Sequence, residues 1–385
     1  MTELSNTEKQ RYLRHLILPE VGEKGQLKLK HASVAIVGAG GLGSPVALYL
    51  AAAGVGRLGL IDFDSVDLSN LQRQVLYAVS DVKKSKSETA RDKLLALNPE
   101  IEVSSHKMRL SAANVMETLA DYDLVVDGTD NFETRYLIND ACVLSSKPNV
   151  YGSIFRFEGQ LSVFCTTTGP CYRCIFPVPP EPDAVPNCAE GGVLGVLAGV
   201  IGTLQATEAV KLILGEGQPL IGKLLLYNAL DMDFQKLAIK RKRDCPVCGE
   251  QPTITRPADL SISCANPVER ASTTGGDMHG SDIDVVDVAK ILKERANEIL
   301  LLDVRNDNEV AFCKIEGSKH IPLNELPTRF NELDKNAETY IYCRSGARSR
   351  NAVEYLKQNG FTSLRNVRGG ILEWSDKVDS TIPKY

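Results

Sequence analysis

The stretch Val34-Ala-Ile-Val-Gly-Ala-Gly-Gly-Leu-Gly43 decides the first half of the fold. Its apolar residues are typical of a buried strand, and they lead into glycines and then into a helix-like run. Gly38, Gly40 and Gly43 fit the pattern G-x-G-x-x-G, which lets a phosphate approach the N–H groups of a helix N-terminus. A second apolar strand then ends in an acid, Asp62. The pattern predicts a nucleotide-binding β-α-β unit.

Length and composition limit the classes of protein to which the chain belongs. Its 385 residues predict two or three domains, and a hydrophobic content of 43 % is normal for a globular protein. A net charge of −5 without a clustered basic face argues against nucleic-acid binding. The N-terminus has no apolar signal segment, and the longest apolar stretch, near Val193–Leu204, is interrupted by glycines. We expect this stretch to be too short to span a bilayer, and the protein to be cytoplasmic.

Alternating strand and helix patterns indicate the fold class. A helix is expected near 83–97, and an apolar strand at 122–127 ends in polar residues. This alternation predicts an α/β fold with a Rossmann-like, mostly parallel sheet whose ligands bind at the carboxyl ends of the strands. From Asn149 the pattern changes to an antiparallel extension, with strands at 158–164 and 223–239.

A polar segment divides the chain. Residues 253–280 are rich in Ser, Thr, Pro, Asn and Gly and predict a linker. Residues 281–385 alternate strands and helices again, which is enough for a smaller α/β domain. We therefore predict a first domain at 1–252, a linker and a second domain.

Two C-x-x-C pairs lie far apart in the first domain, at Cys171 and Cys174 and at Cys245 and Cys248. In a cytoplasmic chain, cysteines are more naturally metal ligands or nucleophiles than disulfides. Four thiolates complete a tetrahedral Zn²⁺ site, and a metal with four sulfur ligands is structural. Buried free cysteines or a redox pair are the alternatives, but neither explains the doubled spacing.

Polar side chains surround the predicted phosphate turn. Asp62 supplies an acid for a ribose, and Arg73 and Lys86 supply cations for a polyphosphate. Asp130 offers a carboxylate suited to Mg²⁺, and Asn70 lies in the same loop as Arg73. A nicotinamide dehydrogenase would need only the first of these groups. The set therefore favours ATP and Mg²⁺ over hydride transfer.

A second reactive motif, Cys343-Arg-Ser-Gly-Ala-Arg-Ser349, follows an apolar strand and begins a helix. Helix N–H groups, with Arg344 and Arg348, stabilise a thiolate, so Cys343 is expected to be nucleophilic. A tyrosine-phosphatase loop has a similar plan but encloses more residues between its Cys and Arg. Cys188 is a lone thiol in a Pro/Cys-rich loop, and by itself it is equally consistent with a nucleophile and with a structural residue.

Together, these motifs resemble two known families. Residues 1–252 resemble the MoeB/ThiF adenylyltransferases, relatives of the ubiquitin-activating enzymes, and residues 281–385 resemble a rhodanese domain. The fusion is similar to the MoeZ-type adenylyltransferase/sulfurtransferases. The motifs that carry the resemblance are Gly-Ala-Gly-Gly-Leu-Gly-Ser, Ser69-Asn-Leu-Gln-Arg73, Gly128-Thr-Asp-Asn131, both cysteine pairs and Cys-Arg-Ser-Gly-x-Arg-Ser.

The resemblance implies roles for individual residues. It assigns the nucleotide to Gly38, Gly40, Gly41, Gly43, Asp62, Ser69, Asn70, Arg73, Lys86, Asp130 and Asn131. Arg14 matches an arginine that reaches the ATP site of the partner subunit, which implies a homodimer. Cys188 matches a cysteine that attacks the acyl adenylate or receives the carrier. Cys343 would carry a persulfide, while Asp303 and Arg305 would be structural.

The resemblance also implies partners. The first domain would adenylate the C-terminal glycine of a ubiquitin-like sulfur carrier of the MoaD/ThiS type that ends in Gly-Gly. A cysteine desulfurase or thiosulfate would supply the sulfur. Molybdenum cofactor, thiamine, cysteine and tRNA-thiolation routes stay open. The alternatives are a dinucleotide-dependent oxidoreductase with a phosphatase-like domain and a non-catalytic scaffold. The presence of every nucleotide-binding and thiol group argues against the scaffold.

Overall fold

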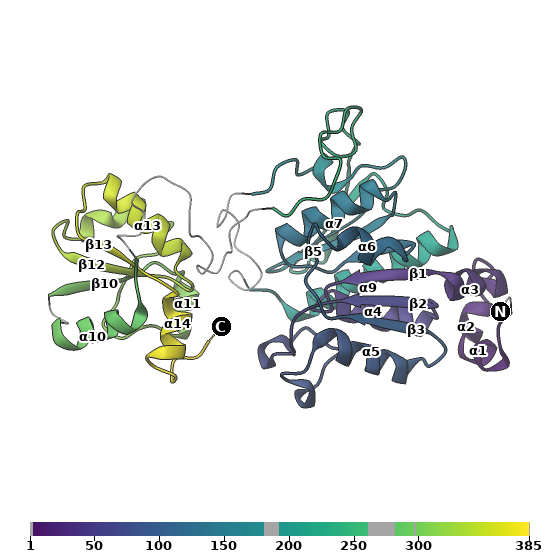
Figure 1. Ribbon diagram of the computed structural model, residues 1–385, viewed down its shortest axis with the longest axis horizontal. Helices are drawn as coiled ribbons and strands as arrows, with labels where there is room; N and C mark the ends of the chain where they lie inside the picture. The colour runs from purple at the N-terminus through teal and green to yellow at the C-terminus, as the bar shows by residue number, and fades with distance from the viewer. Residues whose placement is uncertain (1–2, 181–191, 261–281, 296–297, 385) are drawn as a thin grey trace. The chain divides into compact units, whose positions relative to one another are not determined.

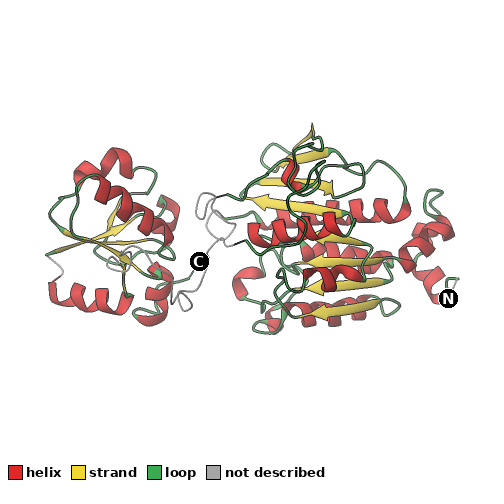
Figure 2. Ribbon diagram, turned by 45° about the horizontal axis from the view of Figure 1, so that its top comes forward, coloured by secondary structure: helices red, strands yellow, loops and turns green. Residues whose placement is uncertain are grey.

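The computed structural model describes residues 3–180, 192–260, 282–295 and 298–384. The chain divides into two units, Met1–Cys264 and Ala265–Tyr385, and each unit is built on a sheet of its own (Figure 1). Helices lie on both faces of the strands in each unit (Figure 2).

An eight-stranded sheet forms the first unit, in the order β3-β2-β1-β4-β5-β6-β7-β8. The strands are β1 (Ser33–Val37), β2 (Arg57–Ile61), β3 (Glu102–His106), β4 (Leu124–Asp127), β5 (Asn149–Phe155), β6 (Glu158–Phe164), β7 (Lys223–Asn228) and β8 (Asp233–Ala238). Pairing is parallel from β3 to β5 and antiparallel from β5 to β8. The predicted fold class, a mostly parallel α/β sheet with an antiparallel extension, is confirmed.

Helices cover this sheet because alternate residues of its strands point to opposite faces. The helices are α1 (Asn6–Arg11), α2 (Leu13–Leu16), α3 (Gly22–His31), α4 (Gly43–Ala53), α5 (Lys86–Leu97), α6 (Val115–Ala120), α7 (Phe132–Leu144) and α9 (Gly195–Leu214). Val34 and Ile36 of β1 pack with α4, α5 and α9, whereas Ala35 and Val37 pack with α6 and α7. Burial on both faces explains why β1 reads as a continuous apolar run.

Helix α9 is longer than the apolar stretch near Val193–Leu204. It runs for 20 residues, and among the described residues it alone is long and apolar enough to cross a membrane by length and composition. The expectation that this stretch is too short is therefore wrong, because the helix continues past Leu204 to Leu214. It packs on α4, β5 and β6, and a Cβ at Gly202 would lie 2.6 Å from the carbonyl oxygen of Leu42.

A parallel sheet of five strands forms the second unit, in the order β11-β10-β12-β13-β9. Its strands are β9 (Asp282–Ile283), β10 (Ile299–Asp303), β11 (Lys319–His320), β12 (Glu338–Tyr342) and β13 (Leu364–Val367). Its helices are α10 (Val285–Arg295), α11 (Asp307–Phe312), α12 (Leu326–Arg329), α13 (Ala347–Gln358) and α14 (Gly370–Lys377). Residues of α12 and α13 pack on one face of the sheet, and residues of α10 and α14 pack on the other.

Candidate active sites and metal centre

The glycine turn between β1 and α4 is built from close backbone contacts. Gly38 has φ +88°, and a Cβ there would lie 2.8 Å from the carbonyl oxygen of Gly128, just beyond β4. A Cβ at Gly43 would overlap the carbonyl oxygen of Gly38. Glycine is therefore required at both positions for the turn to close against the end of β4.

A cavity of about 500 Å³ opens at this turn, at the carboxyl ends of the parallel strands. The nucleotide-binding candidates that line it are Gly38, Gly40, Gly41, Asp62, Arg73, Lys86, Asp130 and Asn131. Ser69 and Asn70 lie in a short 3₁₀ helix, Leu68–Asn70, outside this lining. The carbonyl oxygen of Ser69 accepts from Nη1 of Arg73 at 3.3 Å. These two residues therefore shape the loop that presents Arg73.

Asp62 and Lys86 bring opposite charges to the turn. The Asp62 carboxylate accepts the N–H groups of Ala39 and Asp64, each at 2.8 Å, and so ties β2 to the glycine turn. Burial raises the pKa of Asp62, and the nearby charge of Lys86 opposes that shift. Lys86 begins α5, and only 7 % of its side chain is exposed. Its Nζ lies 3.1 Å from Asp64, whose side chain is half exposed, so the cavity presents a buried cation to an anionic ligand.

A buried pair, Asp127 and Arg135, lies deeper in the site, and sequence reasoning did not find it. Oδ1 of Asp127 accepts from the N–H and hydroxyl of Thr129 at 3.0 and 2.6 Å. Oδ2 of Asp127 and Nε of Arg135 lie 3.8 Å apart, and neither atom has a hydrogen-bond partner among the described residues. Burial raises the pKa of Asp127. Arg135 lines the cavity, so it adds a further cation to Arg73 and Lys86.

Asp130 and Asn131 follow β4 at the rim of the cavity, and both are exposed. The side-chain oxygen of Asn131 accepts the N–H of Thr134 at 2.9 Å and caps α7. Asp130 thus stands at a helix N-terminus, with its carboxylate available to a cation. Because Asn131 fixes the start of α7, it helps to set the position of Asp130.

Arg14 lies at the other end of the sheet. It is exposed on α2, which packs against α3, and α3 ends directly before β1 (Figure 1). The helices that precede β1 therefore border the amino ends of the strands, whereas the cavity is at their carboxyl ends. Arg14 is not among the residues that line the cavity of its own chain.

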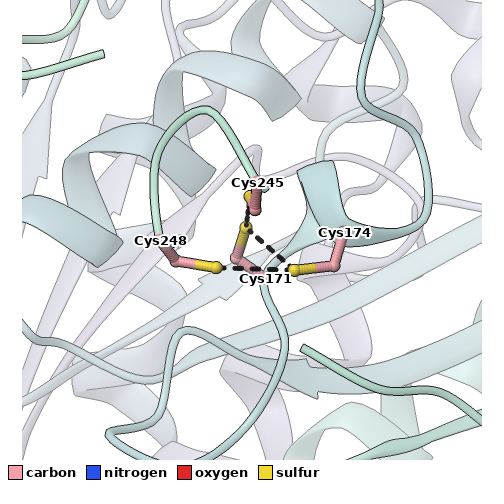
Figure 3. A group of neighbouring side chains, drawn as sticks. All are labelled: Cys171, Cys174, Cys245 and Cys248. Atoms are coloured by element: carbon pink, nitrogen blue, oxygen red, sulfur yellow. Dashed lines mark hydrogen bonds between the residues drawn. The ribbon is translucent and has the colours of Figure 1, made fainter. Parts of the chain in front are cut away.

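The four cysteines of the C-x-x-C pairs converge on one point (Figure 3). All four are buried, and their sulfur atoms lie within 4.8 Å of one another. The distance between sulfur atoms is 3.9 Å for Cys171 and Cys174, 3.5 Å for Cys171 and Cys245, and 3.4 Å for Cys174 and Cys248. Zn–S bonds of about 2.3 Å in a tetrahedron place sulfurs about 3.8 Å apart, so the cluster fits a four-sulfur metal site.

The second reactive centre surrounds Cys343, which follows β12 and is 1 % exposed. Its Sγ accepts the N–H of Gly346 at 3.1 Å and lies 3.5 Å from Oγ of Ser349. Gly346 has φ +98° and immediately precedes α13. A Cβ at Gly370 would overlap the carbonyl oxygen of Cys343, so the loop packs directly on the start of α14. The thiol is thus enclosed by the N-terminal turn of a helix.

Charged pairs hold this loop in place. The two terminal guanidinium nitrogens of Arg348, Nη1 and Nη2, donate to the buried carboxylate of Glu309 on α11, at 2.6 and 2.7 Å. Arg348 therefore anchors the loop, in addition to the electrostatic role expected for it. Arg344 follows Cys343 directly and is partly buried. Below the loop, Asp303 and Arg305 form a fully buried ion pair at 2.6 Å. Cys188 lies outside the described residues.

Comparison with known proteins agrees with both centres. The ThiF family matches residues 12–247, and the rhodanese-like domain matches residues 286–377. The chain is 42 % identical to adenylyltransferase and sulfurtransferase MOCS3 of Culex quinquefasciatus, over 100 % of this chain and 91 % of that protein. It is also 42 % identical to the probable adenylyltransferase/sulfurtransferase MoeZ of Mycobacterium tuberculosis, over 99 % and 96 %.

Solved structures with the same fold match the first unit. The structure of E. coli MccB with ATP has a TM-score of 0.53 and 26 % identity, and covers 62 % of this chain and 74 % of that one. E. coli MccB with AMPCPP and MccA has a TM-score of 0.57 and 26 % identity, over 64 % and 75 %. The predicted resemblance is confirmed. The chain therefore belongs to the ThiF family of ATP-using adenylyltransferases and carries a rhodanese-like sulfurtransferase domain after its ThiF domain.

Proposed function

We propose that this enzyme adenylates the C-terminal glycine of a ubiquitin-like sulfur carrier of the MoaD/ThiS type and then converts that glycine to a thiocarboxylate. One observation carries the proposal: a single cavity brings the glycine turn, the buried Lys86 and Asp130 to one edge of the sheet. A carboxylate is a poor electrophile, so AMP is installed as a leaving group before sulfur attacks. The fused sulfurtransferase domain would supply the sulfur that attacks the acyl adenylate.

Adenylation follows from the groups around the cavity. Turn N–H groups, Arg73 and Lys86 hold the phosphates, and Asp62 holds the ribose. The exposed Asp130 carboxylate suits Mg²⁺, which prefers carboxylate and phosphate oxygens and would neutralise phosphate charge when bound. The carrier carboxylate attacks the α-phosphorus, a C–O–P linkage forms, and pyrophosphate leaves.

Sulfur transfer uses Cys343. A cysteine desulfurase or thiosulfate loads it as a persulfide, and the terminal sulfur attacks the acyl carbon while AMP leaves. A thiol then attacks the Cys343 sulfur, forms a disulfide with it and releases the thiocarboxylate. Cys188 is proposed as that thiol, on the basis of the family resemblance. Two further thiol equivalents, or one dithiol, then reduce the disulfide and restore both cysteines, with the added thiols left as a disulfide.

Three further features complete the proposal. Zn²⁺ occupies the four-cysteine cluster and has a structural role, since sulfur fills every coordination position. The enzyme is a homodimer in which Arg14 of each subunit reaches the other's cavity, because helix α2, which carries Arg14, lies at the end of its own sheet opposite the cavity. Its location is cytoplasmic, where thiols stay reduced.

The test is ATP–pyrophosphate exchange with purified Gly-Gly carriers. Asp130→Ala should lower exchange by about 100-fold or more, because it removes the proposed magnesium ligand. The control is Asp92→Ala, on the exposed surface of α5. Cys343→Ala should keep exchange and lose thiocarboxylate formation, measured by mass spectrometry, whereas Cys313→Ala should keep both. Absence of exchange with every carrier, or robust NADH oxidation, would refute the proposal.

A further inference from the structure

A chain of hydrogen bonds leads away from the reactive thiol across two strands. Ser349 on α13 lies 3.5 Å from Sγ of Cys343, and its hydroxyl donates to Oδ1 of Asn366 on β13 at 2.7 Å. Nδ2 of Asn366 donates to Oδ1 of Asp282 on β9 at 2.9 Å. Oδ2 of Asp282 pairs with Arg350 at 3.3 Å. Ser349 and Asn366 are fully buried, so water does not compete for these contacts.

The direction of each bond follows from which atoms can donate. A carboxylate only accepts, so Asp282 fixes the amide of Asn366 with its nitrogen outward and its oxygen toward Ser349. That oxygen accepts but cannot donate, and it therefore takes the single hydroxyl proton of Ser349. The hydroxyl also lies within donor distance of Sγ of Cys343, at 3.5 Å, but its single proton goes to the shorter contact with Asn366 at 2.7 Å, so Ser349 turns lone pairs toward the sulfur.

We propose that Asn366 and Asp282 are positioning residues that hold the Ser349 hydroxyl as a hydrogen-bond acceptor toward Cys343. The inference rests on the proposed role of Cys343 as the sulfur-carrying thiol. An acceptor favours the protonated thiol and does nothing to stabilise a thiolate. The Cys343 thiolate is thereby kept more basic and a poorer leaving group, so the loaded persulfide yields its outer sulfur to a nucleophile less readily.

The sulfur chemistry makes this testable. The Cys343 thiolate attacks the outer sulfur of thiosulfate, the S–S bond to the sulfite group breaks, and sulfite leaves with the electron pair. Cyanide then takes the terminal sulfur of the persulfide as thiocyanate, and Cys343 leaves as a thiolate. Loading needs the thiolate, so the acid limb of the pH profile reports how well the loop stabilises it.

Neighbouring charges also act on the thiol and must be kept constant. The charged groups that border the loop are Arg344, Arg348, Glu309, Arg350, Asp282 and Arg368. Asn366→Leu changes none of these charges, nearly conserves side-chain size and removes the acceptor that holds the Ser349 proton. The freed hydroxyl can then turn its proton to the sulfur.

The experiment compares pH profiles of thiosulfate-to-cyanide sulfur transfer by the intact chain. Asn366→Leu should move the acid limb about 1 pH unit lower, since a hydrogen bond to the thiolate is gained. In a Ser349→Ala background, Asn366→Leu should change nothing. Asp282→Asn releases the amide orientation but also removes a negative charge, so only the part of its shift that disappears in the Ser349→Ala background counts for the role of Asp282. If Asn366→Leu does not fold, Asn366→Val, which also removes the acceptor and changes no charge, decides the question.

Controls separate this inference from the proposed function. Asp287→Asn, on the exposed side of α10, should leave the profile unchanged. An unshifted profile in the folded variant, or a shift that persists without Ser349, would overturn the inference. Sulfur transfer that survives Cys343→Ala would instead overturn the proposed role of Cys343.

Discussion

Single atoms decide whether the phosphate turn closes. Gly43 faces the carbonyl oxygen of Gly38, and Gly38 faces that of Gly128, so three backbone segments meet without space for a methyl group. The atoms in the way belong to the backbone, which cannot swing aside as a side chain would. A larger residue would therefore displace the backbone of the turn and distort the cavity that the turn borders.

Gly43→Ala should destabilise the first unit by about 1–3 kcal/mol and weaken ATP binding, because the added methyl group pushes β1 from α4. Denaturant unfolding and nucleotide titration would measure the two effects. Gly199→Ala is the matched control: it lies in α9 with no atom within 4 Å of the added carbon. There, helix propensity predicts equal or greater stability. Equal stability of the two variants would contradict the argument.

Local patterns were enough to predict the residues that cluster near the turn. Asp62, Lys86 and Asp130 line one cavity because the ends of adjacent parallel strands meet. The contacts of Arg135 with Asp127 and of Arg348 with Glu309 could not be predicted. Each joins a helix to another element, and neither spacing nor periodicity fixes how a helix rotates over a sheet. The individual roles of the cavity residues stay predictions.

Two short segments are tied together by the four-cysteine cluster. Cys171 directly precedes the 3₁₀ helix Tyr172–Cys174 and Cys174 ends it, whereas Cys245 and Cys248 follow β8. The cluster adjoins the apolar core that includes Tyr136 and Tyr172. The C-x-x-C spacing predicted this contact, whereas the strand order that brings the end of β8 near the cluster was not readable from spacing. Without a metal, four buried thiol groups would lie within 4.8 Å of one another with no ion to bind them together.

Removal of the metal should therefore weaken the first unit. Chelation, or Cys248→Ser, should lower its melting temperature by about 10 °C, which corresponds to roughly 4 kcal/mol of lost folding free energy. Cys313→Ser, in the second unit, should leave this transition unchanged. Calorimetry and metal analysis would be combined. Active protein with almost no zinc would rule out the assignment.

At the scale of the whole molecule, each cavity is proposed to need a second chain. Helix α2, which carries Arg14, borders the amino ends of the strands, and the cavity lies at the carboxyl ends. One chain cannot bring Arg14 into its own cavity without unfolding the helices that precede β1. In a two-fold symmetric dimer, Arg14 of each subunit can reach the cavity of the other subunit.

Complementation tests the shared site. Arg14→Ala and Asp130→Ala homodimers should both be inactive in ATP–pyrophosphate exchange. Mixed dimers contain one doubly altered site and one intact site, so random exchange of equal amounts should restore about one quarter of wild-type activity. A mixture of Asp130→Ala with Lys86→Ala, whose residues share one cavity, is the control for sites in the same chain. It should restore no activity, because each site of that mixed dimer lacks one residue, whereas the Arg14→Ala, Asp130→Ala double variant mixed with wild type should retain about one quarter, against one half if sites are not shared.

Failure of the first mixture, in a sample whose two tagged variants co-purify as mixed dimers, would place Arg14 outside the partner's site. If the tags do not co-purify, subunits do not exchange, and co-expression of the two tagged variants would then supply the mixed dimer directly. Inactive co-expressed dimers of the Arg14 pair would show that the shared-site proposal is wrong.

The cysteine cluster has one more consequence, which concerns the unfolded chain. Between Cys174 and Cys245 lie α9, β7 and β8, so a bound metal closes a loop of the chain that contains the last two strands of the sheet. A chain that loses its fold but keeps the metal has fewer conformations to explore, and closing a loop of this size lowers its entropy. Refolding of the metal-loaded chain would then begin with the two ends of this segment already together.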